Sequence, residues 1–480
     1  MILRNTLTNQ KETFSPLSDE VVTIYTCGPT VYSEPHIGNW VAYIRWDTLI
    51  RTLNVSGYTI KRVMNITDVG HLTGENQGDA DSGEDKMSKG ARQEGITEWE
   101  VADRYTHRFL EGMTALNLLP PEFLAKATEH IDIQIDLVRQ LESKGFTYIL
   151  DDGVYFDTAK FPTYANFAHL DLAAQQAGAR VAFNSNKRNN SDFVLWRLNP
   201  AGETRTMQWE SPWGQGIPGW HIECSAMAMK YLGETIDIHT GGIDHIPVHH
   251  TNEIAQSEAA TGKQFARYWL HNAHLLSDGT KLSKSLGNSY TLADIAERGY
   301  NPMDFRMFIL QSHYRTETNF TWDNLAAAKQ RLTRWRSVAA LAWQTHDTLD
   351  DDDDKDDQHG INGKILAAPH AALEALQDDL NTPEALVAIE RVMDEIDVTP
   401  LHNLQHSALQ QMIQWIDDTL GLQLFISTPD ISDDQKKRII ERRHARDHKD
   451  WGTSDTIRDE LLAEGIILRD TAHHTIWSRT

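Results

Sequence analysis

The feature that most restricts the fold lies near the start of the chain, where a short β-branched run, 21–27, ends in a turn at Gly28. From His36 to Gly57 the apolar residues then recur with a period close to 3.6, which predicts a helix. A second strand-like run, 58–66, comes next. A strand, a polar turn, a helix and a further strand make one βαβ unit. The sequence therefore predicts an α/β fold built on a parallel sheet of nucleotide-binding type.

The segment after this unit reads as a polar loop followed by helices. Residues 70–95 are hydrophilic and rich in glycine, which favours a loop. Amphipathic periodicity then predicts helices over 97–116 and 128–144, the second ending at Gly145. Strand-like residues on both sides of 151–153, an Asp-Asp-Gly turn, predict a β-hairpin there.

The parallel sheet resumes after an irregular stretch. Residues 160–218 are rich in Asn, Gly and Trp and read as an insertion between two halves of the sheet. Strand-like runs follow at 235–239 and 268–276. Asn301, followed by a proline, then predicts a helix start, with Asn as the cap and Pro at the first helical position. One sheet is thus expected from two separated stretches of chain.

The C-terminal part has the composition of helices and charged segments. Residues 350–357 contain seven aspartates and one lysine, a self-repelling run that predicts a linker. Leucines and alanines at heptad-like spacing over 365–420 predict a helical bundle. Between Lys436 and Lys449, seven basic residues face two acidic ones. Such a run suits either a phosphate-binding surface or a solvated helix face, and both remain open on composition alone.

Length and net charge set the broad class. A chain of 480 residues is too long for a single core and predicts three or four domains. Its net charge of −24 argues against broad, sequence-blind binding to a polyanion. No run of about 18 apolar residues occurs, so no membrane-spanning helix is expected. The first residues lack the apolar core and cleavage site of a signal peptide, and we expect a cytoplasmic protein.

A candidate phosphate site lies at the turn His36-Ile-Gly-Asn39, between the first strand and its helix. A helix N-terminus offers unpaired backbone N–H groups and the positive end of the helix dipole. His36 stands beside these groups. The tetrapeptide alone is a weak signal, because a histidine at a helix start is more commonly a surface residue.

Two similar lysine pentapeptides compete for a second phosphate-binding role. The sequence KLSKS at 281–285 follows a late strand, and Lys281 and Lys284 can balance the charge that develops as pyrophosphate leaves a triphosphate. The sequence KMSKG at 86–90 is almost the same, but it lies in the predicted loop near the first βαβ unit. Its position marks it as a decoy, and the later pentapeptide is the candidate.

The only two cysteines, Cys27 and Cys224, each stand in a polar, glycine-flanked motif. His249 and Glu253 are four residues apart at the start of a predicted helix, so they share one face. The ends of parallel strands lie side by side, which lets Cys27 join the other three in a two-Cys, His, carboxylate metal site. Spacing does not separate neighbours, and two further histidines remain competing ligands: His245 and His250.

Six motifs together resemble those of cysteinyl-tRNA synthetases, in the same order along the chain. They are Cys27-Gly-Pro-Thr30, His36-Ile-Gly-Asn39, Asn65-Ile-Thr-Asp68, Gly219-Trp-His-Ile-Glu-Cys-Ser-Ala-Met227, His249-His-x-Asn-Glu-Ile-Ala-Gln256 and Lys281-x-Ser-Lys-Ser285. The similarity extends from about Leu7 to Trp477. The chain is therefore identified as a member of this family of class I aminoacyl-tRNA synthetases.

The resemblance implies a Rossmann-type parallel-sheet catalytic domain with an inserted connective subdomain, followed by an α-helical anticodon-binding region. It implies that ATP activates L-cysteine to cysteinyl-adenylate, and that cysteine then moves to the 3′-terminal adenosine of tRNA(Cys). The expected segments are the first half of the catalytic domain at 1–130, the connective subdomain at 131–218, the second half at 219–290, a stem-contact helical segment at 291–345, the acidic linker at 346–362, a tRNA-binding helical bundle at 363–427 and an anticodon-binding segment at 428–480.

The resemblance also implies roles for single residues. The catalytic residues would be His36, Asn39, Lys281 and Lys284, and the ATP-binding residues Thr30, His36, Gly38, Asn39, Gly241, Gly242, Asp244 and Lys284. The substrate-binding residues would be Gly28, Thr67 and Trp220, with an ordinary core position as the alternative for Trp220. Asn39 departs from the family, which often has histidine there, yet its amide can still donate a hydrogen bond to a phosphate.

One zinc ion per chain is implied as well, held by Cys27, Cys224, His249 and Glu253, together with magnesium bound with ATP. Serine is nearly isosteric with cysteine, and a pocket that separates such analogues by shape gains only about 1–3 kcal/mol. Zinc prefers a thiolate to a neutral hydroxyl. Direct coordination of the substrate sulfur would therefore discriminate where packing does not.

Two other functions compete with this one. A cysteine ligase that joins activated cysteine to an amino-sugar in low-molecular-weight thiol biosynthesis would lack the anticodon region, and the residues beyond 360 count against it. A non-catalytic tRNA-binding paralogue would have lost His36, Lys284 or the metal ligands. The expected partners are tRNA(Cys), ATP and L-cysteine, with no membrane, and the protein is expected to be a monomer.

Overall fold

The computed structural model describes residues 1–70, 85–170, 186–200, 202, 205–282, 287–344, 360–470 and 475–479. The predicted linker at 350–357 lies outside these residues. The chain divides into two compact units: Met1–Ile295 with Tyr314–Asn319, and Ala296–His313 with Phe320–Thr480. Among the described helices, none combines the length and the apolar character needed to cross a membrane.

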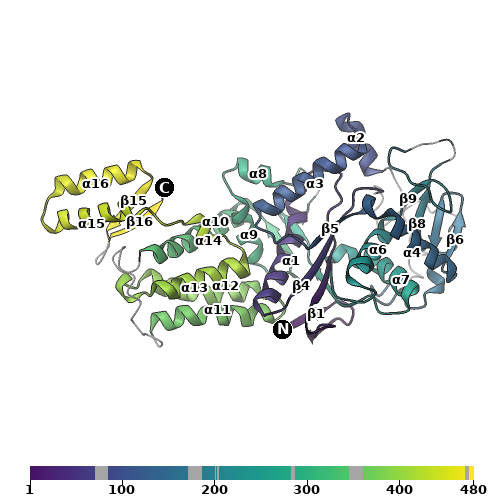
Figure 1. Cartoon of the computed structure of the whole chain (residues 1–480), viewed down its shortest axis with the longest axis horizontal. Helices are drawn as coiled ribbons and strands as arrows, with labels where there is room; N and C mark the ends of the chain where they lie inside the picture. Colours follow the sequence, from purple (N-terminus) through teal and green to yellow (C-terminus); the bar gives the residue numbers. More distant parts are fainter. Residues whose placement is uncertain are drawn as a thin grey trace. The chain divides into compact units, whose positions relative to one another are not determined.

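A five-stranded parallel sheet forms the centre of the first unit, in the order β11-β10-β3-β4-β5. Figure 1 labels its strands β4 and β5. Its strands are β3 Val22–Thr26, β4 Ile60–Ile66, β5 Phe123–Lys126, β10 Ile236–Gly242 and β11 Ala266–Asn272. Helix α1, Ile37–Val55, connects β3 to β4, so the predicted βαβ unit is confirmed. The chain order reverses between β3 and β10, and open α/β sheets bind ligands at such a switch point.

The residues on these strands explain why the sheet is central. Ile24, Val63 and Ile238 are fully buried, as expected for parallel strands that are covered on both faces. Helix α1 ends just before Gly57, whose φ of 90° suits a residue without a Cβ. The predicted return of the sheet at 235–239 and 268–276 is confirmed by β10 and β11.

The prediction of a loop over 70–95 is wrong for its described second half. Residues Lys86–Glu94 form helix α2, followed by α3, Glu98–Ala115. The carboxylate of Asp85 caps α2 by accepting hydrogen bonds from the N–H groups of Met87 (2.8 Å) and Ser88 (3.2 Å). The decoy pentapeptide is thus helical, because a capped end and a buried Met87 outweigh its polar composition.

The insertion between β5 and β10 has its own sheet. Helix α4, Ile131–Ser143, precedes four antiparallel strands: β6 Thr147–Leu150, β7 Gly153–Phe156, β8 Phe193–Leu198 and β9 Gly216–Pro218. The predicted hairpin at 151–153 is confirmed, whereas the irregular region predicted over 160–218 contains β8 and β9. The core of the insertion includes residues of α6, Trp220–Leu232, and α7, Thr251–Thr261. The insertion thus supports the helices that carry two of the candidate metal ligands, Cys224 and Glu253.

Short strands complete the first unit. The hairpin of β1, Ile2–Asn5, and β2, Gln10–Thr13, lacks a counterpart in the sequence prediction. It lies beside β11, because the N–H of Thr6 donates to the carbonyl of Trp269 (2.8 Å). A second small sheet contains β12 Leu275–Ser277, β13 Thr280–Lys281 and β14 Thr318–Phe320, and helix α8 spans Leu292–Glu297.

The second unit is mainly helical, as predicted. Asn301 caps α9, Pro302–Leu310, by accepting a hydrogen bond from the N–H of Asp304 (3.0 Å), which confirms the predicted helix start. The other elements are α10 Trp322–Ala339, α11 Ile361–Gln377, α12 Thr382–Asp397, α13 His406–Leu420, α14 Leu424–Ser427, α15 Asp433–Asp447, α16 Trp451–Ala463, β15 Ile466–Asp470 and β16 Thr475–Arg479. Helices α11 to α13 form the bundle expected from the spacing of leucines and alanines.

Candidate active site

The predicted site residues gather at the carboxyl ends of the central strands. Cys27 directly follows β3, and Gly241 and Gly242 end β10. Thr30 and Thr67, beyond the ends of β3 and β4, form a parallel β-bridge. These positions surround the switch point between β3 and β10, where an α/β sheet offers a crevice for a ligand.

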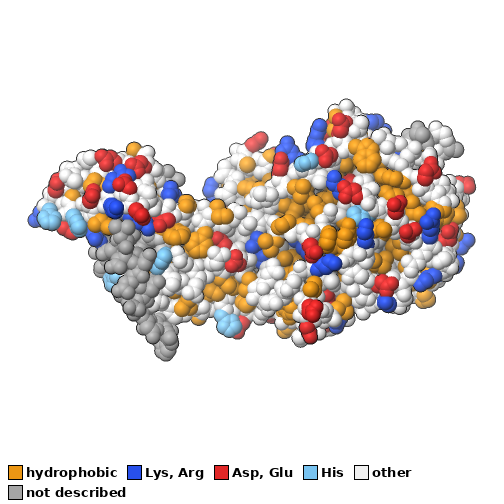
Figure 2. Space-filling model, in the orientation of Figure 1, with side chains coloured by type: hydrophobic (Ala, Val, Ile, Leu, Met, Phe, Trp, Pro, Cys, Tyr) orange, Lys and Arg blue, Asp and Glu red, His pale blue; other side chains and the backbone are white. Residues whose placement is uncertain are grey.

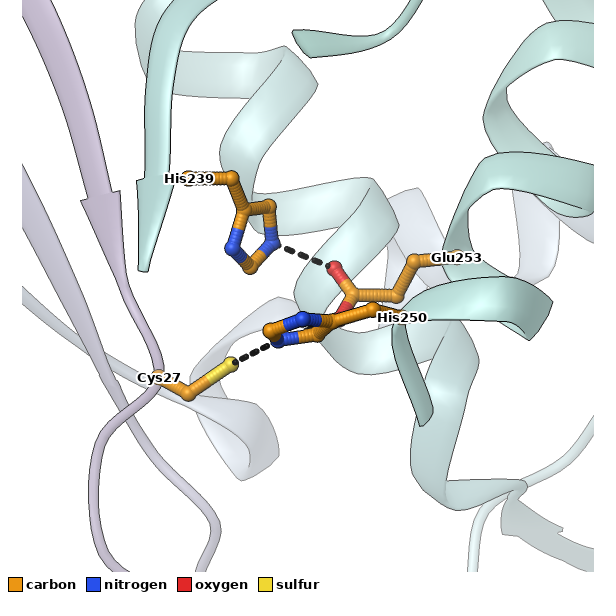
Figure 3. A group of neighbouring side chains, drawn as sticks. All are labelled: Cys27, His239, His250 and Glu253. Atoms are coloured by element: carbon orange, nitrogen blue, oxygen red, sulfur yellow. Dashed lines mark hydrogen bonds and ion pairs between the residues drawn. The ribbon is translucent and has the colours of Figure 1, made fainter. Parts of the chain in front are cut away.

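Two overlapping sets of side chains converge here in a geometry that could hold a metal ion. One is the predicted set of Cys27, Cys224, His249 and Glu253, and the other is Cys27, His239, His250 and Glu253. Within each set, the candidate ligand atoms lie within 4.8 Å of one another. Figure 3 shows the second set, with His239 and His250 on either side of the Glu253 carboxylate. Of the competing histidines, His250 therefore lies in the cluster, whereas His245 belongs to neither set.

Glu253 stands at the centre of this cluster. Its Oε1 lies 2.9 Å from Nε2 of His249, and its Oε2 lies 2.9 Å from Nε2 of His239. The Sγ of Cys27 lies 3.4 Å from Nε2 of His250, whose Nδ1 is 2.7 Å from Nε2 of His271. A π-helical turn, Ile246–His250, precedes α7 and brings His249 and His250 into the same site.

Burial and charge shift the pKa values of these groups in opposite directions. Burial raises the pKa of the Cys27 thiol well above its usual range, and the hydrogen bond with Cys224 adds to this effect. For Cys224, burial also acts to raise the pKa, but the Cys27 hydrogen bond and the nearby His249 lower it to about 6. Burial would lower the pKa of His249, whereas Glu253 and Cys224 raise it to about 10. The site therefore favours a thiolate at Cys224.

The chemistry of the predicted set fits a transition-metal ion. Two cysteine sulfurs, an imidazole and a carboxylate are donors that zinc accepts in tetrahedral sites. The other ring nitrogen of His249, Nδ1, lies 2.9 Å from Nδ1 of His221, a contact of the kind that fixes the orientation of a ligating histidine. The second set offers only one sulfur, which makes it less suited to a soft metal.

Trp220 lies at the edge of this cluster. It begins α6 and is half-buried. Its ring centroid lies 4.5 Å from that of His249, with the two planes inclined by 35°. The indole therefore provides an aromatic wall beside the candidate metal ligands.

The first phosphate signature is positioned at the start of α1, as predicted. Oδ1 of Asn39 accepts a hydrogen bond from the backbone N–H of His36 (3.0 Å). Asn39 is exposed and His36 is half-buried. The amide oxygen of Asn39 thus caps the helix, and this bond does not use the two N–H donors of the same side chain.

The second phosphate signature, the pentapeptide at 281–285, lies close to the first signature at the start of α1. A Cβ on Gly38 would come within 2.7 Å of a methyl carbon of Leu282, so Leu282 lies directly against this glycine. The N–H of Ile37 donates to the carbonyl of Tyr290 (2.7 Å). Lys284 lies outside the described residues, while Lys281 is exposed. The described ends of this lysine-containing loop therefore meet the helix start that carries His36.

The candidate adenosine-contacting residues adjoin the metal cluster. A Cβ on Gly241 would come within 2.6 Å of the His250 ring and 2.7 Å of the His245 ring, so a larger residue would collide with both imidazoles. Asp244 is exposed, and its carboxylate lies 4.0 Å from Nε2 of His245. The end of β10 thus connects the candidate metal site to an accessible carboxylate.

Sequence reasoning missed three buried polar residues of this site: Glu223, His239 and His271. His239 and His271 lie on β10 and β11, where their position near a strand end was the available signal. Glu223 immediately precedes Cys224, and its Oε2 accepts a hydrogen bond from the Thr67 hydroxyl (2.9 Å). Burial raises the pKa of Glu223 well above its usual range, and the neighbouring Cys224 adds to the effect.

The chain is similar to proteins of one known class. Residues 13–330 match the family model for the catalytic domain of class I (C) tRNA synthetases. A methionyl-tRNA synthetase of Mycobacterium tuberculosis, solved in complex with methionyl-adenylate, aligns with a TM-score of 0.60 at 14% identity, over 84% of this chain and 92% of that one. At this identity the likeness shows the fold alone. The parallel sheet and the match over 13–330 define the chain as a class I aminoacyl-tRNA synthetase.

More similar relatives narrow the class to one family. A cysteine–tRNA ligase of Treponema denticola is 41% identical over 99% of each chain, and cysteine–tRNA ligase 1 of Burkholderia lata is 42% identical over 98% of this chain and 95% of its own length. Residues 428–477 match the anticodon binding domain of cysteinyl-tRNA ligases. The chain belongs to the cysteine–tRNA ligase family, as its sequence motifs indicated.

Proposed function

We propose that this protein activates L-cysteine with ATP and transfers it to the 3′-terminal adenosine of tRNA(Cys). The observation that carries the proposal is the buried convergence of Cys27, Cys224, His249 and Glu253 at the sheet switch point, in a chain that aligns over its full length with cysteine–tRNA ligases. The match of residues 428–477 to an anticodon binding domain favours tRNA as the acceptor over a small amino-sugar.

One zinc ion held by Cys27, Cys224, His249 and Glu253 would recognise the substrate through its sulfur. When bound, the ion supplies a site that prefers a thiolate to the hydroxyl of serine. The low pKa of Cys224 and the second sulfur that it supplies favour this set over the one with His239 and His250. We expect His249→Ala to lose the metal and His250→Ala to retain it, as measured by elemental analysis; the reverse result would assign the second set.

The nucleotide would bind between the two phosphate signatures. The start of α1, with His36, Gly38 and Asn39, would face the triphosphate, and magnesium would accompany it. Lys281 and Lys284 balance charge as pyrophosphate leaves. Thr30, Gly241, Gly242 and Asp244 border the rest of the nucleotide, and Asp244 is suited to a ribose hydroxyl. Gly28, Thr67 and Trp220 border the amino acid.

The remaining assignments follow from this activity. The protein would act as a monomer, and tRNA charging favours a location in the cytoplasm. We retain the seven segments predicted from the sequence as its domain division, with tRNA contacts in the segments beyond residue 290.

The decisive experiment compares cysteine with serine in two assays on the purified, metal-loaded protein. ATP–pyrophosphate exchange should depend on cysteine and exceed that with serine by roughly four orders of magnitude or more, because shape alone separates such analogues by only about 10–200-fold. Aminoacylation should require tRNA(Cys). Exchange with cysteine that is followed by no acylation of any tRNA would instead support a small-molecule ligase.

A further inference from the structure

A continuous line of buried hydrogen bonds joins the ends of β3 and β4 to helix α6. The backbone N–H of Gly28 donates to Oδ1 of Asn65 (2.7 Å), and Nδ2 of Asn65 donates to the hydroxyl of Thr67 (3.0 Å). The Thr67 hydroxyl in turn donates to Oε2 of Glu223 (2.9 Å). Asn65, Thr67 and Glu223 are at most 2% exposed. Each hydrogen bond in this line therefore has a fixed donor and acceptor, and the last acceptor is the carboxylate of Glu223.

The line leaves two acceptors at its end. The hydroxyl proton of Thr67 is committed to Glu223, so Oγ1 of Thr67 can receive one more hydrogen bond besides that from Asn65. Oε1 of Glu223 is buried and has no hydrogen-bond partner among the described residues. A buried carboxylate oxygen without a donor is costly, because the site does not replace the water it has lost. A ligand with several N–H donors would satisfy both of these acceptors.

The other buried carboxylates near the site are already occupied. Asp68 accepts hydrogen bonds from the N–H of Thr128 (2.9 Å) and from its hydroxyl (2.7 Å), one on each oxygen. Glu253 lies between His239 and His249. Among these three groups, Glu223 alone has an oxygen without a contacting donor or imidazole.

Glu223 lies where the ammonium group of the substrate would be expected. It directly precedes Cys224 on α6, beside the candidate metal ligands. In cysteine, the ammonium nitrogen is separated from the sulfur by two carbons. A substrate held by its sulfur at the metal therefore keeps its ammonium group within a few ångströms of that point, next to the neighbouring side chains.

We propose that Glu223 holds the α-ammonium group of the amino acid substrate, with Thr67 as the second acceptor. This inference deepens the function proposed above and rests on it. The ammonium group has three N–H donors, which can reach Oε1 of Glu223 and Oγ1 of Thr67, and its positive charge compensates the buried carboxylate. The recognised chemistry is a thiol and a primary ammonium on adjacent carbons.

The test uses thiols that differ in one group each, bound to the full-length, metal-loaded protein and measured by calorimetry. Cysteine carries both the ammonium and the carboxylate, cysteamine lacks the carboxylate, and 3-mercaptopropionate lacks the ammonium. We expect Glu223→Gln to weaken cysteine and cysteamine by a similar factor, roughly 10- to 100-fold, and 3-mercaptopropionate by less than about 2-fold. Zinc content should stay the same as in the parent protein.

Control variants keep the outcome decisive. Glu258→Gln, on α7, changes a carboxylate that accepts from the backbone N–H of Phe265, and it should leave all three affinities unchanged. If Glu223→Gln does not fold, Thr67→Val tests the same line of hydrogen bonds and should show the same order of losses. Equal weakening of all three thiols would overturn the inference by assigning Glu223 to support of the metal site. Unchanged cysteamine binding would overturn it as well.

The inference and the proposed function fail in different ways. If the parent protein shows no cysteine-dependent ATP–pyrophosphate exchange, the proposed function is wrong. If exchange occurs but the three thiols respond alike to Glu223→Gln, the inference alone is wrong.

Discussion

The candidate metal centre and the basic helix α15 are both dense clusters of ionisable side chains, but they are built in opposite ways. In the metal centre, His239 and His249 converge on the one carboxylate of Glu253, at 2.9 Å each, and all three groups are buried. On α15, several basic side chains form ion pairs with acids of other segments: Arg438 meets Glu464 at 2.6 Å, and Arg442 meets Asp470 at 2.9 Å.

The difference separates a site built for a ligand from a cluster that stabilises its own fold. Metal-ligating side chains that lie close together in a buried site are stabilised by a bound cation, which balances their negative charge. Paired charges at the surface need none, and Figure 2 shows basic and acidic side chains interspersed on the visible face of this C-terminal segment. Lys437 and Lys449, which are exposed, form no ion pair among the described residues. RNA contacts by the basic run are therefore best sought at these two lysines.

The largest expected effect breaks the metal centre itself. Cys224→Ser replaces a thiolate by a neutral hydroxyl, which is a poor zinc ligand. We expect loss of the bound metal and a fall of about 10³-fold or more in cysteine-dependent ATP–pyrophosphate exchange. Elemental analysis and exchange kinetics measure the two effects, and circular dichroism checks the fold. An active variant without metal would show that the cluster is structural, like α15.

The next effect separates the two lysine pentapeptides. Lys284→Ala should slow cysteine activation by about 10²- to 10³-fold, because a charge that stabilises the leaving pyrophosphate is lost. Lys89→Ala should change it by less than about 2-fold, since Lys89 is an exposed residue on α2. Pre-steady-state measurement of adenylate formation compares them directly. Equal effects would mean that the helical pentapeptide also acts on the nucleotide.

The sequence predicted the parallel sheet, the candidate ligands and the helical bundle because each has a local signal. The apolar run before Gly28 and the spacing of His249 and Glu253 are visible in one stretch of chain. The orphaned oxygen of Glu223 and the place of His239 depend on residues far apart in the chain, so spacing did not reveal them. Helix α2 was missed because its cap, Asp85, was read as part of a polar loop.

The same limit applies to the basic run. Seven basic residues in fourteen positions suggested a phosphate-binding surface, but the acids that pair with four of them lie before α15, directly after α16 or in β15. The ion pairs with these more distant acids are Lys436–Asp430, Arg438–Glu464, Arg442–Asp470 and Arg446–Asp470. Charge counted along a window does not show partners that the fold brings from outside it.

A smaller effect tests whether α15 is built by internal pairing. Arg442 is buried, and its guanidinium donates to both oxygens of Asp470 at 2.9 Å each. Arg442→Met should lower the free energy of unfolding of the C-terminal part by about 1–3 kcal/mol, because two charge-assisted hydrogen bonds are lost, although Asp470 is partly exposed and keeps its contact with Arg446. Denaturant unfolding followed by tryptophan fluorescence measures this loss.

Lys437→Met is the matched control for that variant. It should change the free energy of unfolding by less than about 0.5 kcal/mol, because Lys437 is exposed. If Lys437 contacts a phosphate, its loss should weaken tRNA(Cys) binding and reduce the salt dependence of that binding by about one unit. An equal loss of stability in both variants would contradict the contrast between paired and unpaired residues on α15.

The smallest effect is a pH dependence of the same ion pair. The hydrogen bonds from Arg442 lower the pKa of Asp470 to about 2, from about 3.9 for a free aspartate. A carboxylate whose pKa is depressed in the folded state contributes stability above its unfolded pKa, and this stability is lost as pH falls from about 4 to about 2. Solvent screening limits the contribution to about 1 kcal/mol or less. Asp470→Asn should flatten the stability profile in that window, and a profile that keeps its slope would assign the acid sensitivity to other carboxylates.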